Sequence, residues 1–151
     1  MKIYLAGRFV NKGILQGVRD DLLRWGHIVT SRWLDGDGAT PVDTAQMDLA
    51  DIDSADALVL YFDRPKKIER PMAGAYIEFG YALAKGKKLV IVYDSVPEHH
   101  IFFQLPEVIT VLGLDQGLRE VLALVAAQPV PVAEDWGYFV SVQPSDWNHG
   151  V

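Results

Sequence analysis

One carboxylate, Glu78, stands alone on an otherwise apolar segment with the pattern of a helix. At a helical period of 3.6 residues its neighbours on the same face are Gly74, Ala75 and Ala82, which all have small side chains. Small neighbours leave room for a ligand in front of the carboxylate, and an acid on an apolar helix is costly to bury. The pattern favours a functional acid. The alternative is a carboxylate at the helix edge or one paired with an Arg or Tyr of the core.

A second carboxylate, Asp48, borders the apolar stripe of the preceding helical segment, whereas Asp51 and Asp53 do not. We therefore expect Asp48 to point inward and to meet Glu78. Two neighbouring carboxyl groups in unequal surroundings can act at an anomeric carbon, one as nucleophile and the other as the acid that assists the leaving group. The alternative for Asp48 is a solvated helix residue.

These acids need elements that bring distant segments together, and short β-rich runs alternate with helical patterns along the chain. We expect strands at residues 2–6, 27–31, 57–62, 87–93 and 108–112. We expect helices around 14–25, 40–55, 74–84 and 116–127, the first stopped by Gly26 and the second begun by Thr40 and Pro41. The alternation predicts an α/β fold, a doubly wound parallel five-stranded sheet with helices on both faces. In such folds ligands bind outside the carboxyl ends of the strands, here the loops after Ala6, Ser31, Phe62 and Tyr93.

The 151 residues, half of them hydrophobic, suit one compact domain, which we place at residues 1–128. Residues 129–151 form a different kind of segment, in which prolines prevent a long helix and aromatic side chains supply apolar surface. We expect this tail to pack on its own domain. The alternatives are a place across a subunit interface or over the ligand.

Composition and motifs exclude several classes of protein. The chain has no cysteine, and hence neither a disulfide nor a thiolate site, and its net charge of −6 opposes binding to a nucleic-acid polymer. Neither a dinucleotide fingerprint nor a Walker-type loop follows the first strand, and no two histidines have the spacing of a helical zinc site. We therefore expect no metal and no organic cofactor. Without a recognisable signal peptide or membrane span, a soluble cytoplasmic protein is expected.

Three motifs in order along the chain resemble the nucleoside 2-deoxyribosyltransferase family, in particular its short bacterial and phage members. The first strand ends in Tyr-x-Ala-Gly, an Asp precedes an Ala-Asp pair by eight residues, and Gly-x-x-x-Glu-x-Gly-x-Ala opens the nucleophile helix. In this chain they are Tyr4 to Gly7, Asp48 with Ala55-Asp56, and Gly74 to Ala82. The resemblance covers about residues 2 to 112 and implies a Rossmann-like fold, in agreement with the pattern of strands and helices.

The resemblance also implies roles for individual residues. Glu78 would attack C1′ of a deoxyribose to give a covalent glycosyl-enzyme, Asp48 would act as acid or base on the nucleobase, and Tyr4 would orient Glu78. Gly7, Arg8 and Phe9 would form a turn near the sugar or its 5′ substituent, with Phe9 as a stacking surface for the base.

The chain departs from the family pattern six residues before the nucleophile. Transferases usually have an Asp there for the sugar hydroxyls, and nucleotide-hydrolysing relatives a Ser for the phosphate, whereas this chain has Met72. The preceding loop is long and basic, with Arg64, Lys66, Lys67 and Arg70. Arg8 and this loop could bind a phosphate, although a solvated loop is the simpler interpretation.

We therefore expect an N-glycosyl transfer enzyme that acts on 2′-deoxyribonucleosides through Glu78, with Asp48 and Tyr4 as its other catalytic residues. Gly7, Arg8, Phe9, Met72 and Gly74 are the predicted substrate-binding residues. The alternatives are an N-glycosidase of 2′-deoxynucleoside 5′-monophosphates, a nucleotide-binding module without turnover, and an interaction protein whose aromatic tail is the working surface. The expected partners are a nucleoside or nucleotide and a free nucleobase, and the resemblance implies a homo-oligomer with sites completed by a neighbouring chain.

Overall fold

A computed structural model of the chain describes residues 1–36, 40–63, 72–94, 101–114 and 116–127. The basic loop at 64–71 and the tail after Gln128 therefore lie outside the described residues, and so does the expected boundary between domain and tail. No helix in the described ranges is long and apolar enough to cross a membrane.

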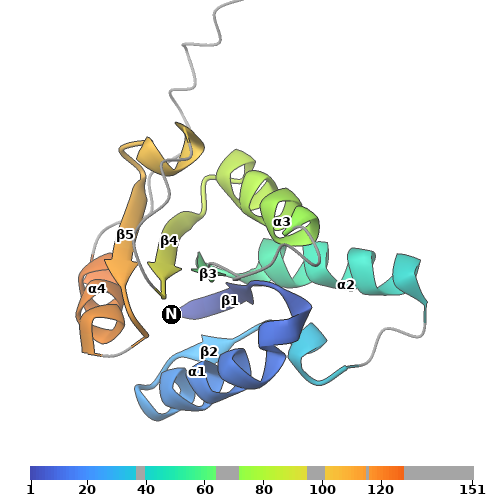
Figure 1. Ribbon diagram of the computed structural model, residues 1–151, viewed down its shortest axis with the longest axis horizontal. Helices are drawn as coiled ribbons and strands as arrows, with labels where there is room; N and C mark the ends of the chain where they lie inside the picture. The colour runs from blue at the N-terminus through green and yellow to red at the C-terminus, as the bar shows by residue number, and fades with distance from the viewer. Residues whose placement is uncertain (37–39, 64–71, 95–100, 115, 128–151) are drawn as a thin grey trace, which may run out of the picture.

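Five parallel strands form one sheet, in the order β2-β1-β3-β4-β5 (Figure 1). They are β1 (Lys2–Ala6), β2 (Ile28–Val29), β3 (Ala57–Phe62), β4 (Lys88–Tyr93) and β5 (Val108–Leu112). The order reverses between β1 and β3, and the loops that leave these two strands therefore diverge to opposite faces of the sheet. A ligand crevice is expected at this reversal, at the carboxyl ends of the strands. The predicted parallel five-stranded sheet is confirmed.

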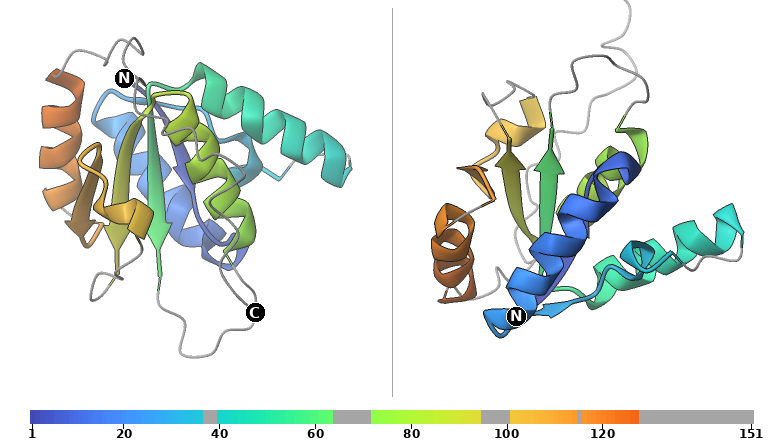
Figure 2. Two further views of the ribbon diagram at one scale, coloured as in Figure 1. Left: turned by 90° about the horizontal axis from the view of Figure 1, so that it is seen from above. Right: turned by 60° about the horizontal axis from the view of Figure 1, so that its bottom comes forward.

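Helices cover both faces of the sheet, as predicted (Figure 2). The helix α1 (Lys12–Arg24) and the helix α4 (Gln116–Ala127) pack on one face. The helices α2 (Pro41–Ser54) and α3 (Ala73–Ala84) pack on the other. Three short 3-10 helices complete the described elements: η1 (Phe9–Asn11), η2 (Arg32–Leu34) and η3 (Ile101–Gln104).

The central strand β3 is buried along its whole length, because both of its faces are covered. Leu58, Leu60 and Phe62 face the α2 and α3 layer, while Val59 and Tyr61 face the α1 and α4 layer. On β1 the same alternation directs Tyr4 toward the layer of α2 and α3. This direction places Tyr4 beneath both predicted acids.

The start of α2 and the end of α1 have the residues predicted from the sequence. The Oγ1 atom of Thr40 accepts a hydrogen bond from the backbone N–H of Asp43 at 3.1 Å, and Pro41 occupies the first helical position of α2. After α1, Gly26 has a φ of 83°, a backbone conformation that residues with a Cβ rarely adopt.

The second strand is shorter than expected, Ile28–Val29 rather than residues 27–31. Side chains replace the missing strand along β1: the hydroxyl of Ser31 accepts from the Leu5 N–H at 2.5 Å and donates to the Leu5 carbonyl at 3.2 Å. The indole Nε1 of Trp33 also donates to this carbonyl, at 2.9 Å. Periodicity alone cannot show that side chains satisfy these backbone groups, and this is why the prediction extended the strand.

Candidate active site

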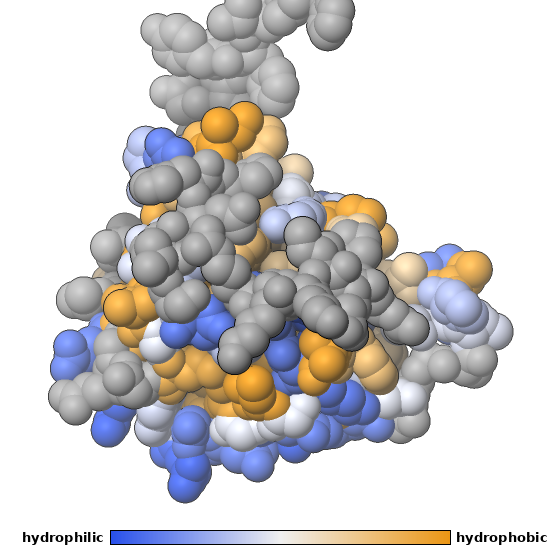
Figure 3. All heavy atoms as spheres, viewed as in Figure 1, coloured by the Kyte–Doolittle hydropathy of each residue, from blue (hydrophilic) through white to orange (hydrophobic). Residues whose placement is uncertain are grey.

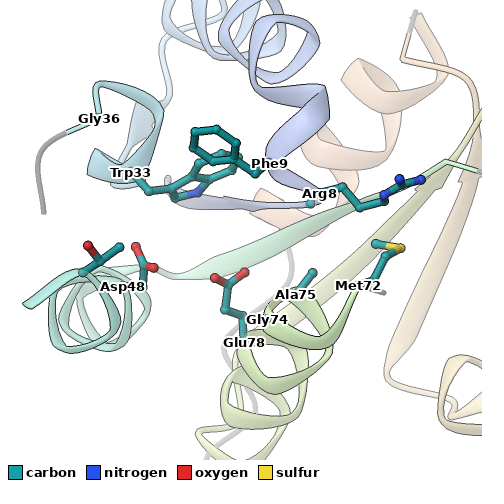
Figure 4. Close-up of a pocket in the computed structure, with 11 residues that line it drawn as sticks. Arg8, Phe9, Trp33, Gly36, Asp48, Met72, Gly74, Ala75 and Glu78 are labelled. Atoms are coloured by element: carbon teal, nitrogen blue, oxygen red, sulfur yellow. The ribbon is translucent and has the colours of Figure 1, made fainter. Parts of the chain in front are cut away.

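A pocket of about 370 Å³ opens at the carboxyl ends of β1 and β3, where the strand order reverses (Figure 4). Seven of the eight predicted site residues line it, and the eighth, Tyr4, is fully buried in the adjoining core cluster. The lining residues are Gly7, Arg8, Phe9, Trp33, Gly36, Thr44, Asp48, Met72, Gly74, Ala75 and Glu78. Segments that are far apart in the sequence thus meet at the predicted edge of the sheet.

Glu78 projects from α3 into the middle of the pocket (Figure 4). Gly74 and Ala75, one turn earlier on α3, line the same pocket, as their small side chains predicted. Burial raises the pKa of Glu78 to about 7; the negative charge of Asp48 adds to this rise and the hydroxyl of Tyr4 opposes it. Near neutral pH this carboxyl group can therefore exchange between its acid and its nucleophilic form.

Asp48 enters the same space from α2, toward one end of the pocket (Figure 4). Its Oδ1 atom is buried and has no hydrogen-bond partner among the described residues. Burial raises the pKa of Asp48 to about 6, with Tyr4 and Arg32 opposing the rise and the charge of Asp51 adding to it. With a pKa of about 6, this carboxyl group is protonated in slightly acidic solution and can then deliver its proton to a leaving group.

The buried side chain of Tyr4 interacts with both acids. Burial raises the pKa of its phenol, and the charges of Glu78 and Asp48 raise it further, so that the hydroxyl keeps its proton. No hydrogen bond of ordinary geometry reaches this hydroxyl within the described residues, yet it is close enough to lower the pKa of both carboxyl groups. The arrangement suits an orienting donor that stabilises negative charge on either acid.

Asp51 does not border the apolar stripe of its helix, yet it is buried. Asp51 is 5% exposed, and it accepts hydrogen bonds from the backbone N–H of Arg32 at 3.0 Å and from its Nε at 2.8 Å. The charge is buried because η2 folds back over α2 and brings a cationic partner that helical periodicity cannot reveal. This ion pair fastens η2 to α2, and with it the adjacent Trp33.

Two aromatic rings form a wall of the pocket on the side opposite the carboxylates (Figure 4). The rings of Phe9 and Trp33 have centroids 6.4 Å apart and are tilted by 38°. Phe9 is 73% exposed, while Trp33 is held by its bond to the Leu5 carbonyl. This wall suits a planar aromatic ligand. Sequence reasoning missed Trp33 as a site residue, although its place just after the second strand, at the ligand edge, was a usable signal.

The opposite end of the pocket is formed by Arg8 and Met72 (Figure 4). Arg8 donates from Nη1 to Oδ2 of Asp63 at 3.1 Å, and the two side chains are only 10% and 15% exposed. The positive charge is thus already balanced by a carboxylate. Met72 is 8% exposed and contributes a thioether to this end of the pocket.

Gly7 is required by packing as well as by its place in the pocket. A Cβ atom at this position would lie 2.8 Å from Cδ1 of Leu15 and 3.4 Å from the Tyr61 carbonyl oxygen. A side chain at this position would therefore displace the end of the buried Leu15 side chain. Within the described residues, no group of three His, Asp or Glu side chains is arranged to hold a metal ion.

Comparison with known proteins places the fold but leaves the reaction open. No protein-family model and no curated protein matches the chain. A CMP N-glycosidase of Clostridium botulinum, BcmB, superposes with a TM-score of 0.57 at 19% identity, over 82% of this chain and 99% of the enzyme. A 2-deoxyribosyltransferase of Leishmania mexicana gives a TM-score of 0.53 at 22% identity, over 62% of this chain and 65% of that one.

The chain has the fold of these two enzymes. The Rossmann-like α/β architecture expected from the sequence is therefore confirmed. Both similar structures are enzymes that act on nucleosides or nucleotides, one as a glycosidase and the other as a transferase. At this level of identity, the likeness extends to the arrangement of the chain rather than to the reaction.

Proposed function

We propose that this protein cleaves the N-glycosidic bond of 2′-deoxyribonucleosides and transfers the deoxyribosyl group to a second base. The observation that carries the proposal is the pair of inward carboxyl groups, Glu78 and Asp48, which share one pocket with an aromatic wall and have pKa values raised to about 7 and about 6. Paired acids of this kind suit chemistry at an anomeric carbon.

In the first step, the Glu78 carboxylate attacks C1′ and the bond between C1′ and the base nitrogen breaks. The electron pair of that bond goes to the base, and protonated Asp48 donates its proton to it. In the second step, the nitrogen of an acceptor base attacks C1′, its proton passes to Asp48, and the Glu78 carboxylate is released. Water as the acceptor would give hydrolysis by the same route.

The layout of the pocket supports a direction for the substrate. Asp48 and the rings of Phe9 and Trp33 would contact the base, Glu78 in the middle of the pocket would face C1′, and Arg8 and Met72 at the other end would face the rest of the sugar. Because Asp63 already balances the charge of Arg8, we assign an unphosphorylated nucleoside as the preferred substrate.

A second candidate is an N-glycosidase of deoxynucleoside 5′-monophosphates. It is favoured by the guanidinium of Arg8 in the pocket wall, which has further N–H donors, and by the likeness to a CMP N-glycosidase. A nucleotide-binding module without turnover is the remaining alternative, motivated by Met72.

The test is incubation of the protein with deoxynucleosides or their monophosphates, with and without a free acceptor base, followed by chromatography of the bases. Base exchange identifies a transferase, and base release that is independent of acceptor identifies a hydrolase. We expect Glu78→Ala to lose both activities, and Glu107→Gln, at an exposed acid between η3 and β5, to keep them.

Trapping supplies the mechanistic evidence. The parent protein incubated without acceptor should gain the mass of one deoxyribosyl group on the peptide that contains Glu78. If neither nucleosides nor nucleotides react and Glu78→Ala behaves as the parent does, the proposal is wrong.

A further inference from the structure

Thr44 lines the active-site pocket, but neither the residues predicted from the sequence nor the proposed mechanism include it. It lies on α2 four residues before Asp48, and both side chains line the same pocket. Residues at this spacing have Cβ atoms about 5–6 Å apart on one face of a helix. Because α2 begins at the outer edge of the molecule, at the right of Figure 3, Thr44 lies outward of Asp48 along the helix. The two side chains can therefore contact neighbouring atoms on one edge of a bound base.

The hydroxyl group of Thr44 has a defined hydrogen-bond polarity. Its Oγ1 atom donates to the carbonyl of Thr40 at 2.9 Å, and a carbonyl oxygen can only accept. Thr40 is itself fixed as the N-cap of α2, where its Oγ1 atom accepts from the backbone N–H of Asp43 at 3.1 Å. Since the single proton of the Thr44 hydroxyl is used in this bond, its oxygen meets a ligand as an acceptor.

Few other polar groups within the described lining can contact the far edge of a base. The indole Nε1 of Trp33 already donates to the Leu5 carbonyl at 2.9 Å, and the ring of Phe9 has no polar atom. Arg8 lies at the opposite end of the pocket (Figure 4). Protonated Asp48 as donor and Thr44 as acceptor therefore form the hydrogen-bonding pair at the base end.

We propose that Thr44 selects the base, so that the pocket prefers bases with an exocyclic amino group, adenine and cytosine, to the corresponding oxo bases, hypoxanthine and uracil. This inference rests on the proposed function, because it assumes that the base lies between Asp48 and the aromatic wall. Adenine presents a ring nitrogen that accepts, N7, beside an amino group that donates, N6. These two groups match the carboxyl group of Asp48 and the hydroxyl oxygen of Thr44.

An oxo base does not match Thr44 in this way. Hypoxanthine has an oxygen at the position of the adenine amino group, and this oxygen would meet the hydroxyl oxygen of Thr44 with no proton between them. Uracil differs from cytosine in the same manner at position 4. One hydrogen bond between uncharged groups corresponds to roughly a 2- to 12-fold difference in affinity or in kcat/KM.

The kinetic test compares kcat/KM for deoxyadenosine with that for deoxyinosine, and deoxycytidine with deoxyuridine. Thr44→Val keeps the shape of the side chain and removes the hydroxyl, whereas Thr44→Ser keeps the hydroxyl. Because the bases also differ as leaving groups, the measured quantity is the change in the amino-to-oxo ratio between parent and variant. We expect Thr44→Val to lower this ratio roughly 2- to 12-fold and Thr44→Ser to keep it.

Thr30→Val is the matched control, because the Thr30 hydroxyl also donates to a backbone carbonyl, that of Ile3 at 3.4 Å, but Thr30 does not line the pocket. We expect this variant to keep the parent's ratio. A merely structural role of Thr44 would lower kcat/KM for the amino and the oxo substrate by the same factor. An unchanged or raised ratio in Thr44→Val overturns the proposal.

Binding of free adenine and free hypoxanthine, measured by titration calorimetry at pH 6, separates this inference from the proposed function. We expect the parent to bind adenine roughly 2- to 12-fold more tightly, and Thr44→Val to bind the two bases equally. If no nucleoside reacts but this difference in binding is found, the proposed reaction is wrong and the selection by Thr44 stands. If the parent binds the two bases equally, prefers hypoxanthine or binds neither, the selection by Thr44 is wrong.

Discussion

The buried hydroxyl of Tyr4 lowers the pKa of both acids of the pocket and so opposes the rise that burial causes. In the proposed mechanism, the reacting form has Glu78 ionised and Asp48 protonated, which is the less populated of the two singly protonated forms because the higher pKa belongs to Glu78. Activity should then rise and fall with apparent pKa values of about 6 and about 7, which belong to the pair rather than to either residue. The replacement Tyr4→Phe removes the one group that lowers the pKa of both acids, while it keeps the ring in the core.

The size of the effect follows from the strength of such a contact. A hydrogen bond to a charged group contributes about 1.5–3 kcal/mol, and one pKa unit corresponds to about 1.4 kcal/mol, which gives a shift of about one to two units. Since no hydrogen bond of ordinary geometry reaches the Tyr4 hydroxyl, we expect the lower end of this range. Both apparent pKa values of the pH–activity profile should rise by about one unit. The optimum should therefore move from about pH 6.5 to about pH 7.5.

The measurement is kcat/KM of base exchange or release between pH 4 and pH 9 for the parent and for Tyr4→Phe. A carbon-13 NMR titration of the carboxyl groups gives the same shift without reference to turnover. Tyr61→Phe is the control, because Tyr61 is also buried but faces the other layer of helices. If both apparent pKa values of Tyr4→Phe stay within a few tenths of a pH unit of the parent's values, or fall below them, the assigned role of Tyr4 is refuted.

Three further predictions concern how residues of the site affect stability and substrate binding. Because the folded state raises the pKa of Glu78 from 4.5 to about 7, ionisation destabilises the fold as the pH rises through this window. Glu78→Gln should accordingly raise the free energy of unfolding at pH 8 by at most about 3 kcal/mol, seen as a higher melting temperature, and leave it unchanged at pH 4. An equal effect at both pH values would contradict this origin. Trp33→Ala should raise KM about 5- to 150-fold, which corresponds to the loss of one base stack; the control is Trp25→Ala, at the end of α1 and outside the pocket lining. Gly7→Ala should lower the free energy of unfolding in urea by about 1–3 kcal/mol through the contact with Leu15, whereas Gly17→Ala, with open space around its Cβ, should not.

The helices and strands of this fold were predictable where the local sequence pattern agreed with the tertiary packing. The apolar run of β3 and the cap at Thr40 with Pro41 needed no knowledge of distant contacts. The small residues in front of Glu78 likewise marked the helix face that opens on the pocket. Each of these signals spans about one turn of helix or one strand.

Features that depend on partners distant in sequence were not predictable in this way. Asp51 is buried because Arg32 reaches it from another element, and β2 stops early because Ser31 and Trp33 bond to Leu5. Both involve side chains that satisfy charges or backbone groups 19 to 28 residues away. For Trp33, the position just after the second strand was a usable signal, whereas its bond to the Leu5 carbonyl is a contact that no periodicity encodes.

The hydrogen bonds from Ser31 and Trp33 to Leu5 link the edge of the sheet to the wall of the pocket. Where β2 ends, β1 becomes the rim of the sheet, and free N–H and C=O groups on a rim can recruit a strand from another molecule. Ser31 and Trp33 close that rim with their side chains, and Trp33 is also a wall of the pocket. The same indole therefore closes part of this rim and forms part of the aromatic wall, so a substitution of Trp33 would expose the rim and remove the wall together.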